Sequence, residues 1–405
     1  MGNISIINGA NLTISPSATQ YSLLTVAGAA LVNASETGVN RKFLHAATLS
    51  KLTIHISSNT ISASSTIRTR INSANGNMLI TVPSSTTGTF QDLVNTDTIV
   101  SGDTVGMVII GGAGGTNAQM RNYGCEINNT SNSESIQAYR TSANTLPATA
   151  NTTFYNAPIS QVAFNVSELT EFKFKSCIAG TRKSLQIYVT SNGRSTSTTF
   201  GSRLNGANGN LSLSVPASST GLYEDTSNSD TIVLDDLYNL YATTGSGSGD
   251  LVYNYVMSCM STTNDVTQAI SVGLNNLSAN TTFWEYLNGR IGGTSTESFA
   301  QTYINQSCTV DCLRVYISSN PNTGTTTVTA RKNGVNTSRT LSITSGATGW
   351  FEDMVNSDSL VSGDLYNFRI VTGATGGATQ FYYIANKVTF TYPAVDNTTN
   401  FFYMF

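Results

Sequence analysis

Aspartate and glutamate gather in one short stretch of the chain, FEDMVNSDSLVSGDLYNF, residues 351–368. Carboxylate oxygens are the ligands that calcium prefers, and paired carboxylates can hydrolyse glycosides. The same pattern occurs twice more, as FQDLVNTDTIVSGDTVGM from Phe90 and as YEDTSNSDTIVLDDLYNL from Tyr223. Because the stretch belongs to a repeated unit, its chemistry has to be judged in all three copies.

The acidic stretches allow two interpretations. Their spacing is not that of an EF-hand loop, and the apolar segments TIV and SLV between the acids read as strands, which would hold the carboxylates apart by about 3.3 Å per residue. Aspartate and asparagine also favour turns, because their side chains hydrogen-bond the local backbone. We therefore predict turns and keep calcium binding as the alternative. The calcium alternative concerns Asp92, Asp97, Asp225, Asp230, Asp353 and Asp358.

The histidines do not indicate a catalytic centre. Both histidines of the chain, His45 and His55, lie in the first copy. The other copies place Tyr188 and Tyr316 at the position of His55, which favours an outward surface side chain over a general base.

Other catalytic patterns are missing from the sequence as well. Glu224 and Asp225 are adjacent carboxylates, but neighbouring residues of a strand point to opposite faces. Dinucleotide, phosphate-loop, CxxC and HExxH motifs do not occur. We therefore expect no enzyme activity and no cofactor.

The composition narrows the class of partner. Charged residues make up 11% of the chain, against about 25% in ordinary domains. A net charge of −3 without a basic face argues against nucleic acid, and no apolar window approaches a membrane span. The N-terminus lacks the pattern of a secretory signal, so we expect folding in a cytoplasm.

Five cysteines, an odd number at uneven spacing, do not form a disulfide framework. Cys308 and Cys312 lie in a predicted strand, where four residues span about 13 Å, too far for a bridge. We therefore expect buried thiols.

Internal repetition organises the whole chain. LTIHISSN at Leu52 matches LQIYVTSN at Leu185, 133 residues further on, and LRVYISSN at Leu313, another 128 residues on. The same shifts connect about fifty residues without a gap. We predict three modules, at 1–128, 145–262 and 274–392, with linkers at 129–144 and 263–273 and an apolar tail at 393–405.

Each module reads as strands. Leu52, Ile54 and Ile56 alternate with polar residues, which is the period of a half-buried strand. Turn signals such as Asn-Gly and Ser-Gly recur every 8 to 12 residues, and helical periodicity is nearly absent. The sequence predicts an all-β fold of three tandem antiparallel β-sandwich domains of the jelly-roll type.

Residues 330–373 resemble modules of tailed-bacteriophage virion proteins of the capsid decoration and fibre type, which have a jelly roll akin to the tumour-necrosis-factor-like fold. The resemblance consists of turn and strand signatures and covers most of each module. It is carried by Lys332, Asn333, Gly334, Gly349, Asp353, Asn356, Ser357, Gly363 and Asp364.

The resemblance implies a non-enzymatic virion component, a capsid decoration, fibre or tail-associated protein that folds in the host cytoplasm. Its expected partners are other virion proteins, such as the major capsid protein. Because modules of this fold associate in threes, the chain could form a pseudo-trimer by itself or a linear string of domains. The residues of the tail that we expect to contact a partner are Phe401, Phe402, Tyr403 and Phe405.

Two other functions stay open at this point. A receptor- or carbohydrate-binding adhesin would use exposed aromatic side chains against sugars on the host surface. A fibre enzyme that degrades polysaccharide is the other. The candidate sugar-stacking residues are Tyr188, Tyr316, Trp284 and Trp350.

Overall fold

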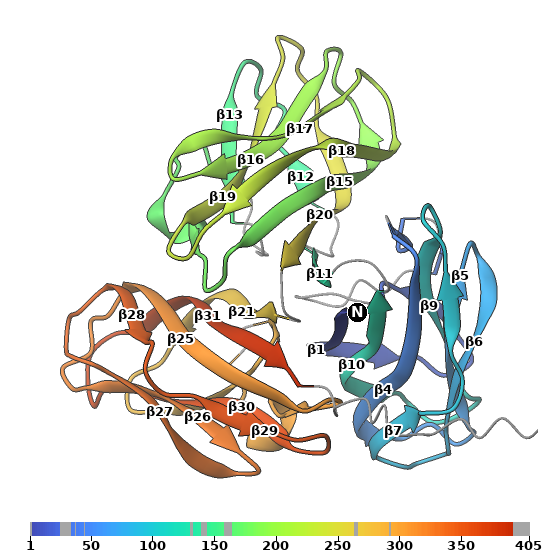
Figure 1. Cartoon of the computed structure of the whole chain (residues 1–405), viewed down its shortest axis with the longest axis vertical. Coiled ribbons are helices and arrows are strands. Elements are labelled where there is room, and N and C mark those ends of the chain that lie inside the picture. The colour runs from blue at the N-terminus through green and yellow to red at the C-terminus, as the bar shows by residue number, and fades with distance from the viewer. Residues whose placement is uncertain are drawn as a thin grey trace, which may run out of the picture.

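The computed structural model describes residues 2–24, 34–36, 38–43, 45–129, 133–138, 144–157, 164–262, 266–290 and 293–391. These residues form three groups of antiparallel strands, which we call repeat 1 (residues 2–129), repeat 2 (133–262) and repeat 3 (266–391). The three repeats lie as lobes around a common centre (Figure 1). The all-β sandwich architecture predicted from the sequence is confirmed.

Repeat 1 is a sandwich of two sheets. Its strands are β1 (Gly2–Ile14), β2 (Thr19–Ser22), β3 (Arg41–Lys42), β4 (Ala47–Asn59), β5 (Ser65–Ile71), β6 (Ala74–Val82), β7 (Gly88–Asp92), β8 (Asp97–Ile99), β9 (Thr104–Ile110) and β10 (Ala118–Asn129). The inner sheet has the order β1–β10–β4–β7, with β8 also paired to β4, and the outer sheet has the order β2–β9–β5–β6, with β3 paired to β9. This interleaved order of eight positions is that of a jelly roll.

Repeat 2 has the same topology. Its elements are β11 (Ser133–Ala138), β12 (Asn144–Leu146), β13 (Thr153–Asn156), the 3-10 helix η1 (Thr170–Phe172), β14 (Phe174–Lys175), β15 (Gly180–Asn192), β16 (Thr198–Leu204), β17 (Ala207–Val215), β18 (Gly221–Ile232), β19 (Leu237–Thr244) and β20 (Leu251–Thr262). The inner sheet is β11–β20–β15–β18 and the outer sheet is β13–β19–β16–β17.

Repeat 3 follows the same plan. Its elements are β21 (Val266–Leu277), β22 (Thr282–Tyr286), β23 (Gly289–Arg290), η2 (Glu297–Phe299), β24 (Thr302–Tyr303), β25 (Cys308–Ser319), β26 (Thr326–Lys332), β27 (Val335–Ile343), β28 (Gly349–Asp353), β29 (Asp358–Leu360), β30 (Leu365–Val371) and β31 (Thr379–Phe390). The inner sheet contains β28–β25–β31–β21 and the outer sheet is β22–β30–β26–β27.

The first strands of the repeats meet at the centre of the molecule. β1 contacts β11, β11 contacts β21, and β23 pairs in parallel with both β1 and β21, which joins the inner sheets of repeats 1 and 3. The predicted linkers are therefore not bare connections. The stretch 129–144 contains β11, and the stretch 263–273 contains the start of β21. These strands escaped prediction because they pair with β20 and β31, which lie more than a hundred residues further along the chain.

The alternation predicted for the central strands is confirmed. Leu52, Ile54 and Ile56 of β4 are each 0% exposed. Burying an aliphatic side chain of this size contributes about 1.5–3 kcal/mol. The same positions of β15 and β25 are buried as well, so one hydrophobic pattern folds each repeat.

The strand register is the same in the three repeats. Asp92 lies opposite Leu52, Asp225 opposite Leu185 and Asp353 opposite Leu313. The residue before each of these leucines has a positive φ: 52° at Lys51, 58° at Ser184 and 55° at Cys312. A bulge at this point bends each inner sheet in the same way.

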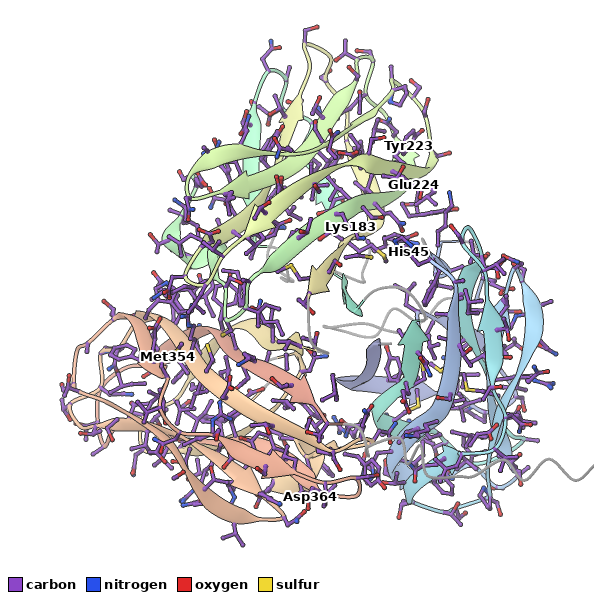
Figure 2. The ribbon with its side chains drawn as sticks, in the orientation of Figure 1. His45, Lys183, Tyr223, Glu224, Met354 and Asp364 are labelled. Atoms are coloured by element: carbon purple, nitrogen blue, oxygen red, sulfur yellow. The ribbon has the colours of Figure 1, made fainter. Side chains whose placement is uncertain are left out.

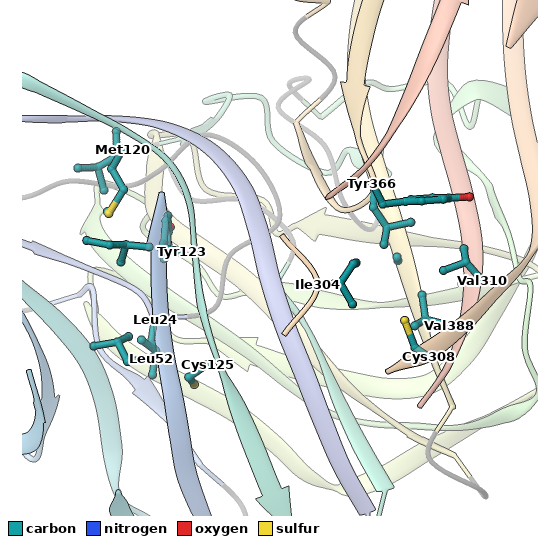
Figure 3. Packing of buried hydrophobic residues seen from close by; sticks show 14 of the residues in the cluster. Leu24, Leu52, Met120, Tyr123, Cys125, Ile304, Cys308, Val310, Tyr366 and Val388 are labelled. Carbon is teal, nitrogen blue, oxygen red and sulfur yellow. The ribbon is translucent and has the colours of Figure 1, made fainter. Parts of the chain in front are cut away.

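The hydrophobic cores continue across the boundaries between repeats. One buried cluster includes residues of repeats 1 and 3, and Ile304 lies between the two groups (Figure 3). The second cluster is centred on repeat 2 but takes in Leu23 of repeat 1 and Tyr383 of repeat 3. The repeats are therefore packed on one another and are not independent domains in a linear string.

One core site has opposite chemistry in different repeats. In repeat 3 the buried Arg339 donates to Tyr366 and to Asn386, both at 2.6 Å, and the Tyr366 hydroxyl donates to Asp358 at 2.5 Å. The repeat shift places Met78 of repeat 1 at the position of Arg339, and the residues at the positions of Tyr366 and Asn386 are small and apolar as well. Asp97, at the position of Asp358, is buried in repeat 1 too, so repeat 3 places polar and charged partners beside a buried aspartate where repeat 1 has apolar side chains.

Candidate functional site: the contacts between the repeats

The first aspartate of each acidic stretch caps a turn. Asp92 accepts hydrogen bonds from the backbone N–H groups of Leu79 (2.8 Å), Val94 (3.1 Å) and Asn95 (3.0 Å). Burial alone would raise the pKa of Asp92, but these backbone hydrogen bonds and the side-chain amide of Asn95 hold the pKa below its ordinary value. Asp225 and Asp353 each accept from the two backbone N–H groups that follow in their own turns.

The second aspartate connects strands inside the sandwich. Asp97 accepts hydrogen bonds from the Thr69 hydroxyl and the Asn77 backbone N–H, both at 2.5 Å. Asp230 accepts from Ser202 and Asn210 at the same positions, also at 2.5 Å. In repeat 3, Asp358 accepts from hydroxyl groups, and the Arg339 guanidinium lies 3.8 Å away.

The third aspartate closes the tight turn. Asp364 accepts from the Val361 backbone N–H and from the Asn333 amide, both at 2.7 Å. The residue before it has a positive φ, 98° at Gly363 and 76° at the corresponding Asp235. Aspartate tolerates this left-handed conformation better than most residues, which explains why LDD can replace SGD in repeat 2.

The carboxylates of the calcium alternative are therefore engaged by protein donors. Among the residues that the structure describes, no group of three His, Cys, Asp or Glu side chains could hold a metal ion. The acidic stretches make turns, as predicted. This applies equally to Asp92, Asp97, Asp225, Asp230, Asp353 and Asp358.

Each repeat extends a segment, which we call its arm, toward the next repeat. The arms follow the first outer-sheet strand and comprise residues 34–36 and 38–43, residues 164–177, and residues 293–306. Each arm is fixed to its own repeat by a bidentate arginine–glutamate pair, a geometry that adds orientation as well as energy. The pairs are Arg70–Glu36, Arg203–Glu168 and Arg331–Glu297.

The arm of repeat 1 lies on the inner sheet of repeat 2. Lys42 pairs with Glu224 at 2.7 Å, and the Tyr255 hydroxyl donates to the Asn40 carbonyl at 3.2 Å. Gly38 approaches so closely that an added Cβ would lie 2.7 Å from the Tyr188 ring. Figure 2 places Glu224 on the side of repeat 2 that faces repeat 1, with His45 at the same boundary.

The arm of repeat 2 lies on the inner sheet of repeat 3 and makes charged contacts. Arg314, whose side chain is 1% exposed, donates to the Ser176 carbonyl at 2.6 Å and to the Asp235 carboxylate at 2.5 Å. Lys175 pairs with Glu352 at 2.6 Å. Burial alone would raise the pKa of Asp235, but the charge of Arg314 and its hydrogen bond hold that pKa below its ordinary value.

Aromatic side chains fill the same interface. Tyr316 is 7% exposed and packs on Trp350, with ring centroids 5.1 Å apart. Trp350 stacks on Tyr383 at 5.9 Å, and Tyr383 meets the edge of Phe174 from the arm of repeat 2 at 5.7 Å. The prediction that Tyr316 is an exposed sugar-stacking residue is therefore wrong, because the outward face of its strand is covered by the neighbouring repeat.

The other candidate aromatic and histidine side chains are also engaged. Tyr188 is half-buried and lies 6.0 Å from Tyr255 beneath the arm of repeat 1. The guanidinium groups of Arg331 and Arg369 lie over the Trp284 ring. His55 is half-buried beside Thr89, and this burial lowers the pKa of the imidazole.

The arm of repeat 3 lies on the inner sheet of repeat 1 and makes neutral contacts. Asn305 accepts from Thr53 at 2.9 Å and from Gln91 at 3.1 Å, and it donates to the Lys51 carbonyl at 3.1 Å. Asn122 donates to the Gln301 carbonyl at 2.7 Å. This third contact closes the cycle.

The three contacts use equivalent positions. The repeat shifts carry Lys42 to Lys175 and then to Tyr303, and carry Gln91 to Glu224 and then to Glu352. The structure joins these positions cyclically. The joined pairs are Lys42–Glu224, Lys175–Glu352 and Tyr303–Gln91, the last at 3.5 Å. A head-to-tail contact repeated in this way produces a closed cyclic arrangement.

The adjacent carboxylates of repeat 2, Glu224 and Asp225, do not form a site, as the sequence predicts. Glu224 points outward to Lys42 of repeat 1, whereas Asp225 points inward and accepts from the Ser212 backbone N–H at 2.8 Å. The two side chains lie on opposite faces of the strand, as the period of two predicts.

Exposed apolar side chains recur at the turn before the third aspartate. Val100, Val233 and Val361 are 56%, 53% and 56% exposed. Val94 and Val355, beside the first aspartate of repeats 1 and 3, are 88% and 91% exposed. The four residues predicted to contact a partner through the C-terminal tail lie outside the described residues. They are Phe401, Phe402, Tyr403 and Phe405.

Several interface residues were missed by the sequence reasoning. Arg314 occupies the position of Thr53 and Gln186, and Asn305 occupies that of Cys177. The sequence did contain a signal, which is a change of chemical type at one aligned strand position. That position is Thr53 in repeat 1, Gln186 in repeat 2 and Arg314 in repeat 3. Such a change indicates a contact that differs between repeats.

Comparisons with known proteins add little. No family model matches the chain, and no curated protein matches it. Among solved structures the chain is similar to one described as "The Triple Jelly Roll Fold and Turret Assembly in an Archaeal Virus", at 12% identity and a TM-score of 0.19, covering 95% of this chain and 91% of that one. At this TM-score the likeness carries no argument about function. Within the described residues, no helix has the length and apolar character needed to cross a membrane.

Proposed function

We propose that the chain is a structural component of a virus particle, a capsid decoration, fibre or tail-associated protein, that acts through protein–protein contacts as a single-chain pseudo-trimer. The carrying observation is the closed cycle of contacts, in which each arm lies on the inner sheet of the next repeat. A part with this form presents three near-equivalent outer faces. The resemblance of the repeated segment to bacteriophage virion modules supports the same function.

The chemistry of the site supports a scaffold. The acidic residues cap turns, the arginine–glutamate pairs fix the arms, and the aromatic side chains of the inner sheets pack between repeats. Each cluster found in the sequence is thus accounted for by a structural contact. Tyr316 is buried in the interface between repeats 2 and 3, so its ring is not exposed to stack on a sugar, as the sugar-binding alternative requires.

We assign the contact with other virion proteins to the repeated valine turns. Val100, Val233 and Val361 occupy equivalent positions, so they present the same apolar side chain three times around the centre. When a partner covers solvent-exposed apolar groups, the complex is stabilised by about 25 cal/mol for each Å² of apolar surface removed from water. A partner with threefold symmetry, such as a capsid protein around a threefold or quasi-threefold point, matches this arrangement.

The test uses particles assembled with the chain and its variants. Mass spectrometry of purified particles should find the chain in a fixed ratio to the coat protein, and antibodies against the folded chain should label the particle surface. The triple variant Val100→Asp, Val233→Asp and Val361→Asp should lose incorporation but keep its melting temperature. Val335→Asp, at a 67% exposed position on β27, is the matched control and should still be incorporated. Absence of the wild-type chain from particles would overturn the proposal.

A further inference from the structure

Two cysteines meet at the interface between repeats 2 and 3. Cys177 belongs to the arm of repeat 2, and Cys312 is the bulge residue of β25, with a φ of 55°. The Cys177 thiol donates to the Cys312 carbonyl at 3.4 Å. The Cys312 thiol also lies within hydrogen-bonding reach of the Cys177 side chain. Both residues are buried, at 2% and 4% exposure.

The equivalent place in another interface shows that sulfur is not needed for the contact. Where repeat 3 meets repeat 1, Asn305 occupies the position of Cys177 and Lys51 that of Cys312. The Asn305 amide donates to the Lys51 carbonyl at 3.1 Å. An amide N–H is a better donor than a thiol, so the structural contact is served at least as well by asparagine. The interface between repeats 2 and 3 differs because its donor, Cys177, and its bulge residue, Cys312, are both cysteines.

The surroundings give the two sulfurs different roles. The hydrogen bond from Cys177 lowers the pKa of the Cys312 thiol, and the Arg314 guanidinium lowers it further against the opposite effect of burial. Burial raises the pKa of Cys177 well above its ordinary value. Because the thiolate is the reactive form of cysteine, Cys312 is the nucleophile of the pair and Cys177 the resolving thiol.

We propose that Cys177 and Cys312 are a site of oxidative cross-linking, where a small peroxide converts the two thiols to a disulfide that joins repeat 2 to repeat 3. The Cys312 thiolate attacks one peroxide oxygen, the O–O bond breaks, hydroxide leaves, and Cys312 becomes a sulfenic acid. The Cys177 sulfur then attacks the sulfenic sulfur, the S–S bond forms, and the S–O bond breaks with loss of water. In sum, the two thiols lose two electrons and two protons, and hydrogen peroxide becomes two molecules of water.

The cross-link would lock the contact between repeats 2 and 3. Opening the molecule between repeats 2 and 3 requires the arm of repeat 2 to leave the inner sheet of repeat 3, and a bond between Cys177 and Cys312 forbids that movement. On the proposed function, a particle leaving a reducing cell interior would meet oxidants after assembly. The chemistry itself does not depend on that function.

The experiment treats the purified full-length chain with an equimolar amount of hydrogen peroxide and counts thiols after denaturation. All five cysteines are reduced at the start, and we expect the count to fall from five to three. Non-reducing peptide mapping should recover one linked pair of peptides, containing Cys177 and Cys312. The melting temperature should rise by several degrees on oxidation and return on reduction.

Two variants provide the controls. Cys177→Asn, which copies the Asn305 contact, should keep its thiol count and melting temperature unchanged on treatment with peroxide. Cys308→Ala removes a core thiol of the same strand and should still form the cross-link. An unchanged thiol count in the wild-type chain, a bond between Cys308 and Cys312, or bonds between chains would overturn the proposal. Peptide mapping of the wild-type chain decides this even if a variant fails to fold.

Discussion

Replacing Arg314 by alanine tests whether the interface between repeats 2 and 3 is held by its buried guanidinium. The substitution removes a charged hydrogen bond to the buried Ser176 carbonyl, which costs about 1.5–2 kcal/mol, the low end for a charged donor, because this carbonyl still accepts from the Asp235 backbone N–H at 3.1 Å. The lost pair with Asp235 adds only about 0.5–1 kcal/mol, because the Asp235 side chain is 57% exposed and returns to water. Glu352 keeps its pair with Lys175. The net loss should therefore be about 2–3 kcal/mol.

Trp350 reports on this interface directly. The chain contains two tryptophans, so Trp284→Phe leaves Trp350, stacked on Tyr383, as the single tryptophan, whose fluorescence can be excited selectively. With a urea dependence of about 2–3 kcal/mol/M, a loss of this size lowers the midpoint of the Trp350 transition by about 1 M. The fluorescence change should precede the loss of β-sheet signal in circular dichroism, since the interface opens before the sandwiches unfold.

The matched control is another ion pair of repeat 3. Lys387 lies 3.1 Å from Asp311, and these side chains are 34% and 29% exposed. Such a pair contributes about 0–1 kcal/mol, so Lys387→Ala should leave the midpoint nearly unchanged. If Arg314→Ala and Lys387→Ala shift the midpoint equally, the guanidinium does not hold the repeats together and our account of the interface fails.

Three further predictions concern the turns and the cores. Gly363→Val should cost about 1–3 kcal/mol because its φ of 98° strains a β-branched residue, whereas Gly363→Asp, which copies Asp235, should cost less; equal melting temperatures for the two variants would contradict this. Asp92, Asp225 and Asp353 have pKa values below the ordinary 3.8, so the stability that they contribute is complete above about pH 5 and is lost as the pH falls through their folded-state pKa values. The melting temperature measured between pH 7 and pH 2 should therefore fall only at the acid end. A fall near pH 6 would point to other groups. Rebuilding this part of the repeat 1 core in repeat 3 should leave the free energy of unfolding unchanged or raise it by about 1–4 kcal/mol, because a well-packed apolar core often replaces buried charged groups without loss. Urea titration measures this change. A clear fall in the free energy of unfolding would show that the charged cluster is needed. That variant is Val310→Leu, Ala330→Thr, Thr337→Gly, Arg339→Met, Tyr366→Val and Asn386→Cys, in which the new threonine hydroxyl donates to Asp358 as Thr69 donates to Asp97.

The local structure of each repeat could be read from the sequence. The alternation at Leu52, Ile54 and Ile56 predicts a strand with one buried face, and the structure confirms it. The acidic stretches predict turns, because aspartate side chains reach backbone N–H groups only a few residues away. Gly363 and Asp235 at one aligned position indicate a left-handed turn for the same local reason. These features depend on neighbours in the chain, which the sequence displays directly.

The outward faces of the strands could not be read in the same way. Tyr316 alternates with core residues as a surface residue would, yet it is buried by the arm of another repeat. Period two separates the two faces of a strand but says nothing about what covers the second face. The strands β11 and β21 were missed because they pair with β20 and β31, which lie more than a hundred residues further along the chain.

By itself the sequence determined that one all-β sandwich is repeated three times, because strand periodicity, turn chemistry and the repeat shifts are all local or countable. Only the tertiary structure decided that the repeats close into a cycle, that Arg314 faces Ser176, and that Cys177 meets Cys312. Those pairs are separated by more than a hundred residues, and their approach depends on how whole sandwiches pack. Packing of that kind is set by the summed shape of the interfaces, which no single pattern along the chain records.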